Sequence, residues 1–352
     1  MQRVKFLDGF RGLAILLVIG FHAYARFTTI VPYGTKYTST PIFSQGFLGV
    51  QLFFLISGFV ILMTLEKSTS FSQFLYKRWI RLFPAMLIAT IIVFSTGLYF
   101  SERPNGVPAL KDAIPGLTFL DPVWINKLLD VNVASLENPF WTLYIEVKFY
   151  IIFGLLYFYS NAKKAVAGIS GMFFIYCILK VMKTKIMPEY SWTIEMCESL
   201  GISSFGWFAC GALSYFYFVE KKIIYLIMAV IIGIACISAY HNYVDSAWAA
   251  SIVLIVFLSA IYFDKLKSVF ASRFLVFFGF ISYPLYLIHE GALISMIVKI
   301  NRFTIIPDIL LPIIPFFILT VIAYLITLYL EPFARAKITT FINFLKPNLA
   351  VK

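Results

Sequence analysis

Long apolar stretches recur along the whole chain, separated by short polar connections. Each stretch approaches the roughly 20 residues that an α-helix needs to cross the hydrocarbon core of a bilayer. We place ten predicted spans at residues 10–26, 47–65, 82–100, 139–160, 165–182, 199–219, 222–240, 246–263, 274–297 and 309–330. The pattern predicts an all-α polytopic membrane protein with about ten transmembrane helices.

Basic residues fall in alternate connections between these spans, beginning with Arg3 and Lys5 before the first one. This distribution marks cytoplasmic loops in membrane proteins. The segment after Glu331 is basic as well, and an even number of spans then places both termini in the cytoplasm. We therefore expect one membrane domain at residues 1–340 and a short cytoplasmic tail at 341–352.

The longest connection, residues 101–138, would lie outside the cytoplasm. It carries charges of both signs and four prolines. A long connection of this kind could be a lid or an acceptor-recognition surface over a membrane site, and a passive linker explains it equally well.

Composition excludes a soluble globular domain, because 61% of the residues are hydrophobic and only 13% are charged. The net charge of +12 could suggest a nucleic-acid partner. The basic residues, however, form short clusters between apolar spans, so we interpret them as topology signals and expect no nucleic acid. Four cysteines lack the spacing of a metal site, and we predict no metal.

Ionisable residues inside a membrane span are costly and therefore indicate function. The candidates here are Arg11, His22, Glu146, Lys148, His289 and Glu290. Arg11 and His22 are eleven positions apart, which returns them to nearly the same helix face roughly 16 Å apart. The helix directions place His22, Glu146 and His289 at a similar depth in the outer half of the membrane. A neutral imidazole could accept a proton from a hydroxyl there, and a carboxylate could orient it.

Other interpretations of these residues stay open. A single histidine in a span often joins two helices by a hydrogen bond, and an arginine near the interface often only extends to the headgroups. Ser57 in FFLISGF has no base near it in sequence, so we interpret it as a packing or substrate-lining residue. Arg78 and Arg81 share a helix face and could either mark topology or bind the phosphates of an acyl donor.

Five motifs stand in order along the ten spans: FRGLAILLVIGFHAY, FFLISGFVI, KRWIRLFPA, FWTLYIEVKFY and ISYPLYLIH. With these motifs the chain resembles the acyltransferase 3 family of membrane acyltransferases, from residue 7 to about residue 332. That family modifies lipopolysaccharide O-antigen, exopolysaccharides, Nod factors, peptidoglycan and some antibiotics, usually with acetyl-CoA as donor. The resemblance implies that Arg11 and His22 are its signature catalytic pair, that Arg78 and Arg81 are its functional arginines, and that Glu146 is its acidic motif residue.

We therefore expect an O-acyltransferase of the bacterial inner membrane, with acetyl as the transferred group, cytosolic acetyl-CoA as donor and a lipid-linked or extracytoplasmic glycan as acceptor. His22 would be the general base or the carrier of the acyl group, Glu146 would orient it, and Arg11, Arg78 and Arg81 would bind donor phosphates. We expect the substrate-binding site to be lined by Ser57, Trp141, Tyr150, Ser282, Tyr283 and His289. A homo-oligomer is compatible with the sequence.

Two rival functions are weaker on the sequence. A transporter or flippase also carries charge at mid-membrane, but it typically has repeat-related halves, which the chain does not show. A membrane-bound O-acyltransferase of the other fold would need an Asn or Asp and His arrangement that is not evident.

Overall fold

The computed structural model describes residues 4–185, 191–239, 246–303 and 306–349, and over these residues the chain is helical with no strand. Arg3 and the last three residues of the predicted tail lie outside the described residues. The long α-helices are α1 (Lys5–Phe21), α3 (Gly49–Leu65), α4 (Phe71–Thr96), α7 (Trp141–Tyr159), α8 (Ala162–Lys185), α10 (Phe205–Glu220), α11 (Ile223–Ala239), α12 (Ala247–Tyr262), α14 (Arg273–Phe303), α15 (Ile313–Leu325) and α16 (Glu331–Leu349). Short α-helices are α2 (Pro41–Ser44), α5 (Ala113–Thr118), α6 (Pro122–Leu129), α9 (Ser191–Ser199) and α13 (Asp264–Phe270).

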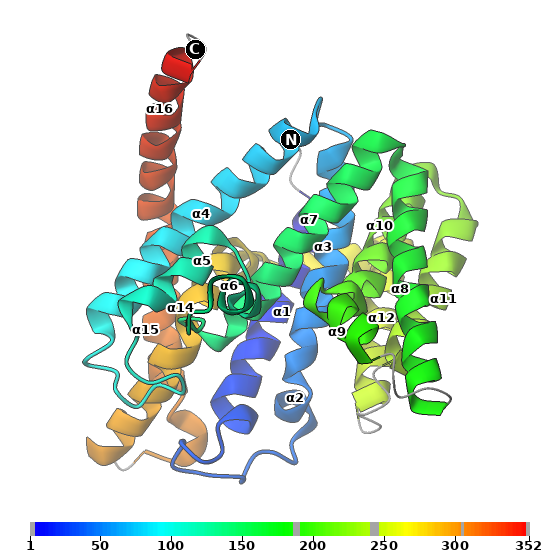
Figure 1. Ribbon diagram of the computed structural model, residues 1–352. Helices are drawn as coiled ribbons and strands as arrows, with labels where there is room; N and C mark the ends of the chain where they lie inside the picture. The colour runs from blue at the N-terminus through cyan, green and yellow to red at the C-terminus, as the bar shows by residue number, and fades with distance from the viewer. Residues whose placement is uncertain (1–3, 186–190, 240–245, 304–305, 350–352) are drawn as a thin grey trace. The chain divides into compact units, whose positions relative to one another are not determined.

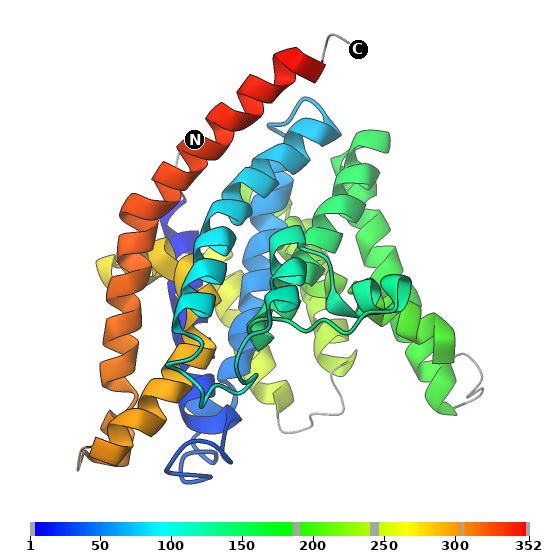
Figure 2. The same ribbon diagram turned by 60° about the vertical axis from the view of Figure 1, so that its left-hand side comes forward.

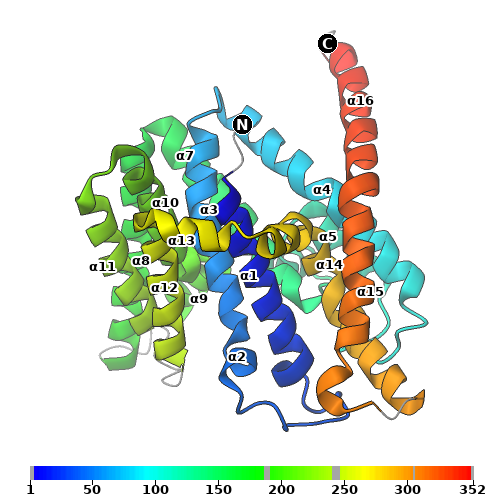
Figure 3. The ribbon, with the colours of Figure 1, turned by 180° about the vertical axis from the view of Figure 1, so that it is seen from behind.

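Eight helical stretches in the described part of the chain are long and apolar enough to cross a membrane. A ninth crossing results if α12 and α13, which meet at 116°, form one bent span; Figure 3 shows this turn. Helix α11 has 17 residues and is about 26 Å long, slightly short of the roughly 30 Å hydrocarbon core. All ten predicted spans are thus helical, and the all-α, multi-pass class is confirmed, while length alone supports eight or nine crossings.

The chain divides into two compact units, and the division falls within α1, α4 and α14, after the first residue of α7 and within the 3₁₀ turn η2 (Gly46–Leu48). The first unit comprises residues 1–18, 47–75 and 142–276. In it α10 packs against α3, α8 and α11, and Figure 1 shows α8, α10, α11 and α12 side by side. A Cβ at Gly58 of α3 would collide with the backbone of Phe208, and one at Gly211 of α10 with the backbone of Leu55. The Ser-Gly step of FFLISGF therefore serves close helix packing, as small residues do in membranes.

The second unit comprises residues 19–46, 76–141 and 277–352. It contains the end of the first span, most of α4, the long connection, most of α14, and α15 with α16. Two π-helical turns lie in it, η1 (His22–Arg26) and η9 (Ile326–Leu330). The second turn links α15 to α16, and Figure 2 shows the two helices as one rod running from orange to red. The boundary predicted at residue 340 falls inside α16.

The connection at residues 101–138 is a folded segment of the second unit. It contains α5, α6 and the 3₁₀ turn η3 (Leu110–Asp112), and it ends where η4 (Asn138–Phe140) begins. Its two ends are joined by a hydrogen bond from Asn105 to the carbonyl of Ser135 at 3.2 Å. The connection is therefore fixed in shape by its own contacts.

Candidate active site

A pair of histidines forms the centre of the candidate site in the second unit. Nδ1 of His22, at the start of the π turn, lies 2.9 Å from Nε2 of His289 on α14. Nδ1 of His289 lies 2.8 Å from the carbonyl oxygen of Tyr286 on its own helix. A carbonyl can only accept, so His289 carries its proton on Nδ1 and presents a lone pair at Nε2. His22 must then donate its Nδ1–H to His289.

A carboxylate occupies the other nitrogen of His22. Oε2 of Glu290 lies 3.1 Å from Nε2 of His22, and the Glu290 side chain is 1% exposed. The second carboxylate oxygen accepts from Asn138, whose Nδ2 is 2.7 Å away and whose backbone nitrogen is 3.3 Å away. Both carboxylate oxygens of Glu290 and both ring nitrogens of His22 are therefore engaged.

These partners determine where a mobile proton can lie. With Nδ1 of His22 as the donor to His289, Nε2 of the neutral ring is an acceptor, and it faces an oxygen that is also an acceptor when ionised. Two acceptors at 3.1 Å need a proton between them. From these contacts we infer one shared proton between His22 and Glu290, which is the arrangement of an acid–base pair.

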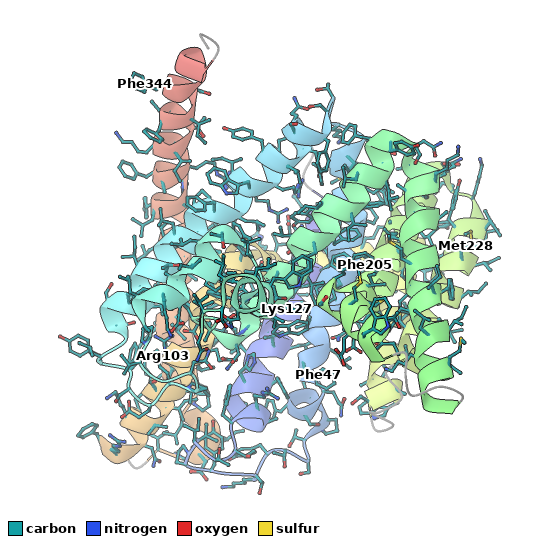
Figure 4. The ribbon with its side chains drawn as sticks, viewed as in Figure 1. Phe47, Arg103, Lys127, Phe205, Met228 and Phe344 are labelled. Carbon is teal, nitrogen blue, oxygen red and sulfur yellow. The ribbon has the colours of Figure 1, made fainter. Side chains whose placement is uncertain are left out.

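A buried ion pair lies against the same stretch of α14. Arg103 and Glu137 meet at 2.5 Å, and their side chains are 2% and 3% exposed. Glu137 also accepts from the backbone nitrogen of Gly291 at 3.0 Å, and Figure 4 labels Arg103 beside α14. Burial raises the pKa of the Glu137 carboxyl to about 7, although Arg103 and the Gly291 N–H act in the opposite direction.

Of the three ionisable side chains at this site, His22 is the least buried. Its side chain is 11% exposed, whereas His289 is 0% exposed and Glu290 1%. The ring of Phe27 stacks on that of His22 with centroids 5.8 Å apart. The π turn that begins at His22 is a feature often found at functional sites, because it redirects side chains that an α-helix would point elsewhere.

Three predicted site residues meet in a second cluster, within the first unit. Oε1 of Glu146 accepts from the hydroxyl of Ser57 at 2.7 Å and from that of Tyr150 at 2.5 Å. The neighbouring Lys148 donates instead to the carbonyl of Ser199 at 2.6 Å. Ser57 and Tyr150 therefore both donate to the Glu146 carboxylate, a pairing that we did not predict from the sequence.

The carboxylate on His22 is that of Glu290, and both ring nitrogens of His22 are already engaged. The orienting role predicted for Glu146 therefore passes to Glu290 in our interpretation. A function of Glu146 itself stays a prediction, now connected with Ser57 and Tyr150.

The predicted donor-binding arginines differ in their surroundings. Arg11 pairs with Asp8 at 3.0 Å in the first unit. Arg78, in the second unit, is only 8% exposed, which is unusual for an arginine that merely marks topology. Arg81 interacts electrostatically with Glu331 at the start of α16. Their binding of a donor stays a prediction.

The remaining predicted substrate-lining residues lie in the second unit. Ser282 donates to the carbonyl of Gly279 at 2.9 Å, a contact within its own helix. Tyr283 donates to the carbonyl of Leu82 at 3.0 Å and so joins α14 to α4. Trp141 is 46% exposed. These contacts give Ser282 and Tyr283 a packing role, and their contact with a substrate stays a prediction.

Sequence reasoning gave no role to Asn138, Glu137 and Arg103, and it named Glu290 only as an ionisable residue. Glu290 had a signal, because it directly follows His289 inside a span. The signal for Glu137 and Asn138 was their position just before FWTLYIEVKFY, where a predicted span begins. Arg103 had none beyond its charge.

Comparisons with known proteins identify the family of the chain. A family model described as an acyltransferase domain, that of acyltransferase 3, matches residues 4–331. An O-acetyltransferase OatA of Staphylococcus aureus (strain NCTC 8325) is 30% identical over 161 residues, which make up 43% of this chain and 24% of that protein. A peptidoglycan O-acetyltransferase OatA of Listeria monocytogenes is 27% identical over 161 residues, which make up 42% of this chain and 23% of that protein.

The matched part of the chain spans about a quarter of the length of these relatives. No solved structure matches the chain. The family model nevertheless covers nearly all of it, from before the first span to the start of α16. The protein therefore belongs to the acyltransferase 3 family of membrane acyltransferases.

Proposed function

We propose that the protein is a membrane O-acetyltransferase that moves an acetyl group from acetyl-CoA to a hydroxyl of a bacterial surface glycan. The single observation that carries the proposal is the 3.1 Å contact between Nε2 of His22 and Oε2 of Glu290, from which we infer a shared proton. O-acetyl transfer needs a group that takes a proton from the attacking hydroxyl, and this pair is such a group.

In the proposed reaction the pair first loses its shared proton to solvent water, which leaves a lone pair on Nε2 beside a carboxylate. The acceptor hydroxyl takes the place of the direct contact between Nε2 and Oε2 and gives its proton to Nε2. Its oxygen forms a bond to the acetyl carbon, the carbon–sulfur bond breaks, and the thiolate leaves. The imidazolium is stabilised by Glu290 and can return the proton to the thiolate.

A covalent route would use the same nitrogen. Nδ1 carries the hydrogen donated to His289, so Nε2 is the nucleophilic atom of the ring and would carry the acetyl group. Both routes therefore place the chemistry at Nε2 of His22.

For the donor side, we propose that Arg78 and Arg81 bind phosphates of acetyl-CoA from the cytoplasm. Support comes from the low exposure of Arg78, because a guanidinium that is withdrawn from solvent can bind an anion strongly. Arg11, paired with Asp8, would contribute less directly.

For the acceptor side, we propose a lipid-linked or extracytoplasmic glycan of the O-antigen, exopolysaccharide or peptidoglycan type, reached from outside the bacterial inner membrane. The name of the Listeria relative supports peptidoglycan. The membership in a family with several glycan acceptors supports the wider class.

The test is acetyl transfer by purified full-length protein given radiolabelled acetyl-CoA and glycan acceptors. We expect labelled glycan from the wild type and none from His22→Ala at equal expression. Label that remains on the wild type, but not on His22→Ala, after rapid denaturation near neutral pH, and that hydroxylamine then removes, would identify the covalent route. Mass spectrometry of surface glycans with and without the gene would identify the acceptor and the acyl group. Glycan movement across vesicles without any acetyl transfer would contradict the proposal and favour a flippase.

A further inference from the structure

We propose that Asn138 is a positioning residue for this reaction, which holds Oε1 of Glu290 so that Oε2 faces His22. The inference rests on the proposed function. On this inference the end of the 101–138 connection orients the acid–base pair, whereas the sequence suggested that the connection is a lid or a linker.

The contacts of Asn138 favour one orientation of the carboxylate. Two donors of the same residue, Nδ2 at 2.7 Å and the backbone nitrogen at 3.3 Å, reach the same oxygen of Glu290. An oxygen that accepts two N–H groups holds negative charge well and has little tendency to bind a proton. The shared proton is thereby directed to Oε2, the oxygen 3.1 Å from His22.

Both neighbours of Asn138 are bound to the helix that carries Glu290. The preceding Glu137 accepts from the backbone nitrogen of Gly291 at 3.0 Å. The carbonyl of the following Pro139 accepts from the hydroxyl of Tyr286 at 3.1 Å. Asn138 is therefore fixed to α14 on each side, and its distance from Glu290 depends little on the rest of the connection.

Gly291 makes this attachment sterically feasible. A Cβ at position 291 would lie 2.7 Å from Nε of Arg103 and 2.8 Å from Oε1 of Glu137. A glycine in a helix interior is otherwise unfavourable. Its place directly after Glu290 is explained by the close approach of the Arg103–Glu137 pair.

Several charged groups surround the carboxyl that Asn138 contacts. His22 faces it directly, and Arg26 and Glu137 act on it electrostatically. His289 lies behind His22. Loss of the Asn138 donors leaves these groups in place, so a change in pH dependence would report on the Asn138 contact itself.

The chain offers a matched control in the same connection. Asn126 closes the connection on itself, with Oδ1 accepting from the backbone nitrogen of Val133 at 2.8 Å and Nδ2 donating to its carbonyl at 2.9 Å. Asn126→Ala therefore removes two side-chain hydrogen bonds of the connection, one more than Asn138→Ala removes, without touching a bond of Glu290. This variant therefore distinguishes a general loss of order in the 101–138 connection from a loss of the contact that positions Glu290.

The experiment compares wild-type protein with Asn138→Ala, Asn138→Asp and Asn126→Ala. We would measure kcat against pH with acetyl-CoA, and the infrared carbonyl stretch of protonated Glu290 against pH, assigned by its loss in Glu290→Gln. Asn138→Ala should lower kcat about tenfold, since the backbone donor remains, and should move both midpoints about one unit to higher pH. The reason is that a carboxylate with fewer donors keeps its proton more strongly.

Asn138→Asp has the same shape and places an acceptor against Oε1, so its midpoints should move further in the same direction. Asn126→Ala should keep the wild-type midpoints and lose only thermal stability. Unchanged midpoints in both Asn138 variants, or the same shift in Asn126→Ala, would overturn the inference. If the wild type transfers no acetyl group, the proposed function fails, while the infrared midpoint still decides whether Asn138 acts on Glu290.

Discussion

His289 accepts the Nδ1–H of His22 through its Nε2 atom, 2.9 Å away, and is itself held by the carbonyl of Tyr286. His289 therefore selects the tautomer of His22, and with it the nitrogen that can act as a base. A residue that fixes a tautomer contributes to the rate without touching the substrate.

We predict that His289→Ala lowers kcat by about one to two orders of magnitude while the KM for acetyl-CoA changes little, because the ring of His22 loses its orienting acceptor. His289→Gln, whose amide oxygen can accept the same hydrogen, should recover part of the loss. Steady-state kinetics of purified variants, with expression and melting temperature as controls, would measure this. Equal activity of all three proteins would show that His289 is only a packing residue.

Glu290→Gln should abolish the shared proton, because an amide does not ionise in this pH range. We expect a fall in kcat of about a hundredfold or more, and we expect the acid limb of the pH profile to move to lower pH, because His22 then titrates without a carboxylate beside it. Glu146→Gln is the comparison: an amide oxygen can still accept from Ser57, so we expect its pH profile to keep the wild-type shape. If the two variants exchange these behaviours, Glu146 is the orienting carboxylate after all.

Arg81→Ala should raise the KM for acetyl-CoA by about tenfold and leave kcat within about twofold, because a contact to the nucleotide is equally strong in the ground and transition states. Arg273→Ala provides a control, since Arg273 is an exposed arginine at the start of α14, in one of the basic connections between predicted spans. Donor titrations of both variants would separate phosphate binding from general charge. An unchanged KM in Arg81→Ala would show that Arg81 does not bind the donor and only marks the cytoplasmic side of the membrane.

Gly291→Ala should destabilise the protein by about 1–3 kcal/mol and lower activity, because the new Cβ forces Arg103 and Glu137 away from α14. Gly171→Ala, in helix α8, meets nothing within 4 Å and should be neutral or slightly stabilising. Melting temperatures in detergent, together with kcat, would test the pair. A wild-type melting temperature for Gly291→Ala would mean that the ion pair does not depend on this close approach.

Much of the fold follows from the sequence because each span is an uninterrupted apolar run, and a bilayer permits few alternatives to a helix. The depth of His22 and His289 was also predictable from helix rise, and the structure brings these two residues into contact. Depth, however, gives one coordinate only. The rotation of each helix decides which side chain meets which, and the sequence contains no direct signal for it.

The choice between Glu146 and Glu290 shows this limit. Glu146 lies in the fourth motif and Glu290 directly follows the fifth, but only Glu290 is joined to His22 by a described contact. The roles of Asn138 and Arg103 were harder still to predict, because their partners are 152 and 34 positions away in the chain. Pairings at such separations come from tertiary packing and leave no periodic pattern.

Because His22–Arg26 form a π turn, the first span holds one residue more than an α-helix of the same path would need. A homologue that lacks this residue could continue as an α-helix with its later side chains facing as they do here, whereas an α-helix that kept the residue would rotate every later side chain by about 100°. Alignments through residues 22–26 should therefore tolerate a one-residue gap. A search pattern that fixes the spacing from His22 to the tyrosines that follow would overlook such homologues, and a deletion scan of these five residues would reveal which position is the insertion.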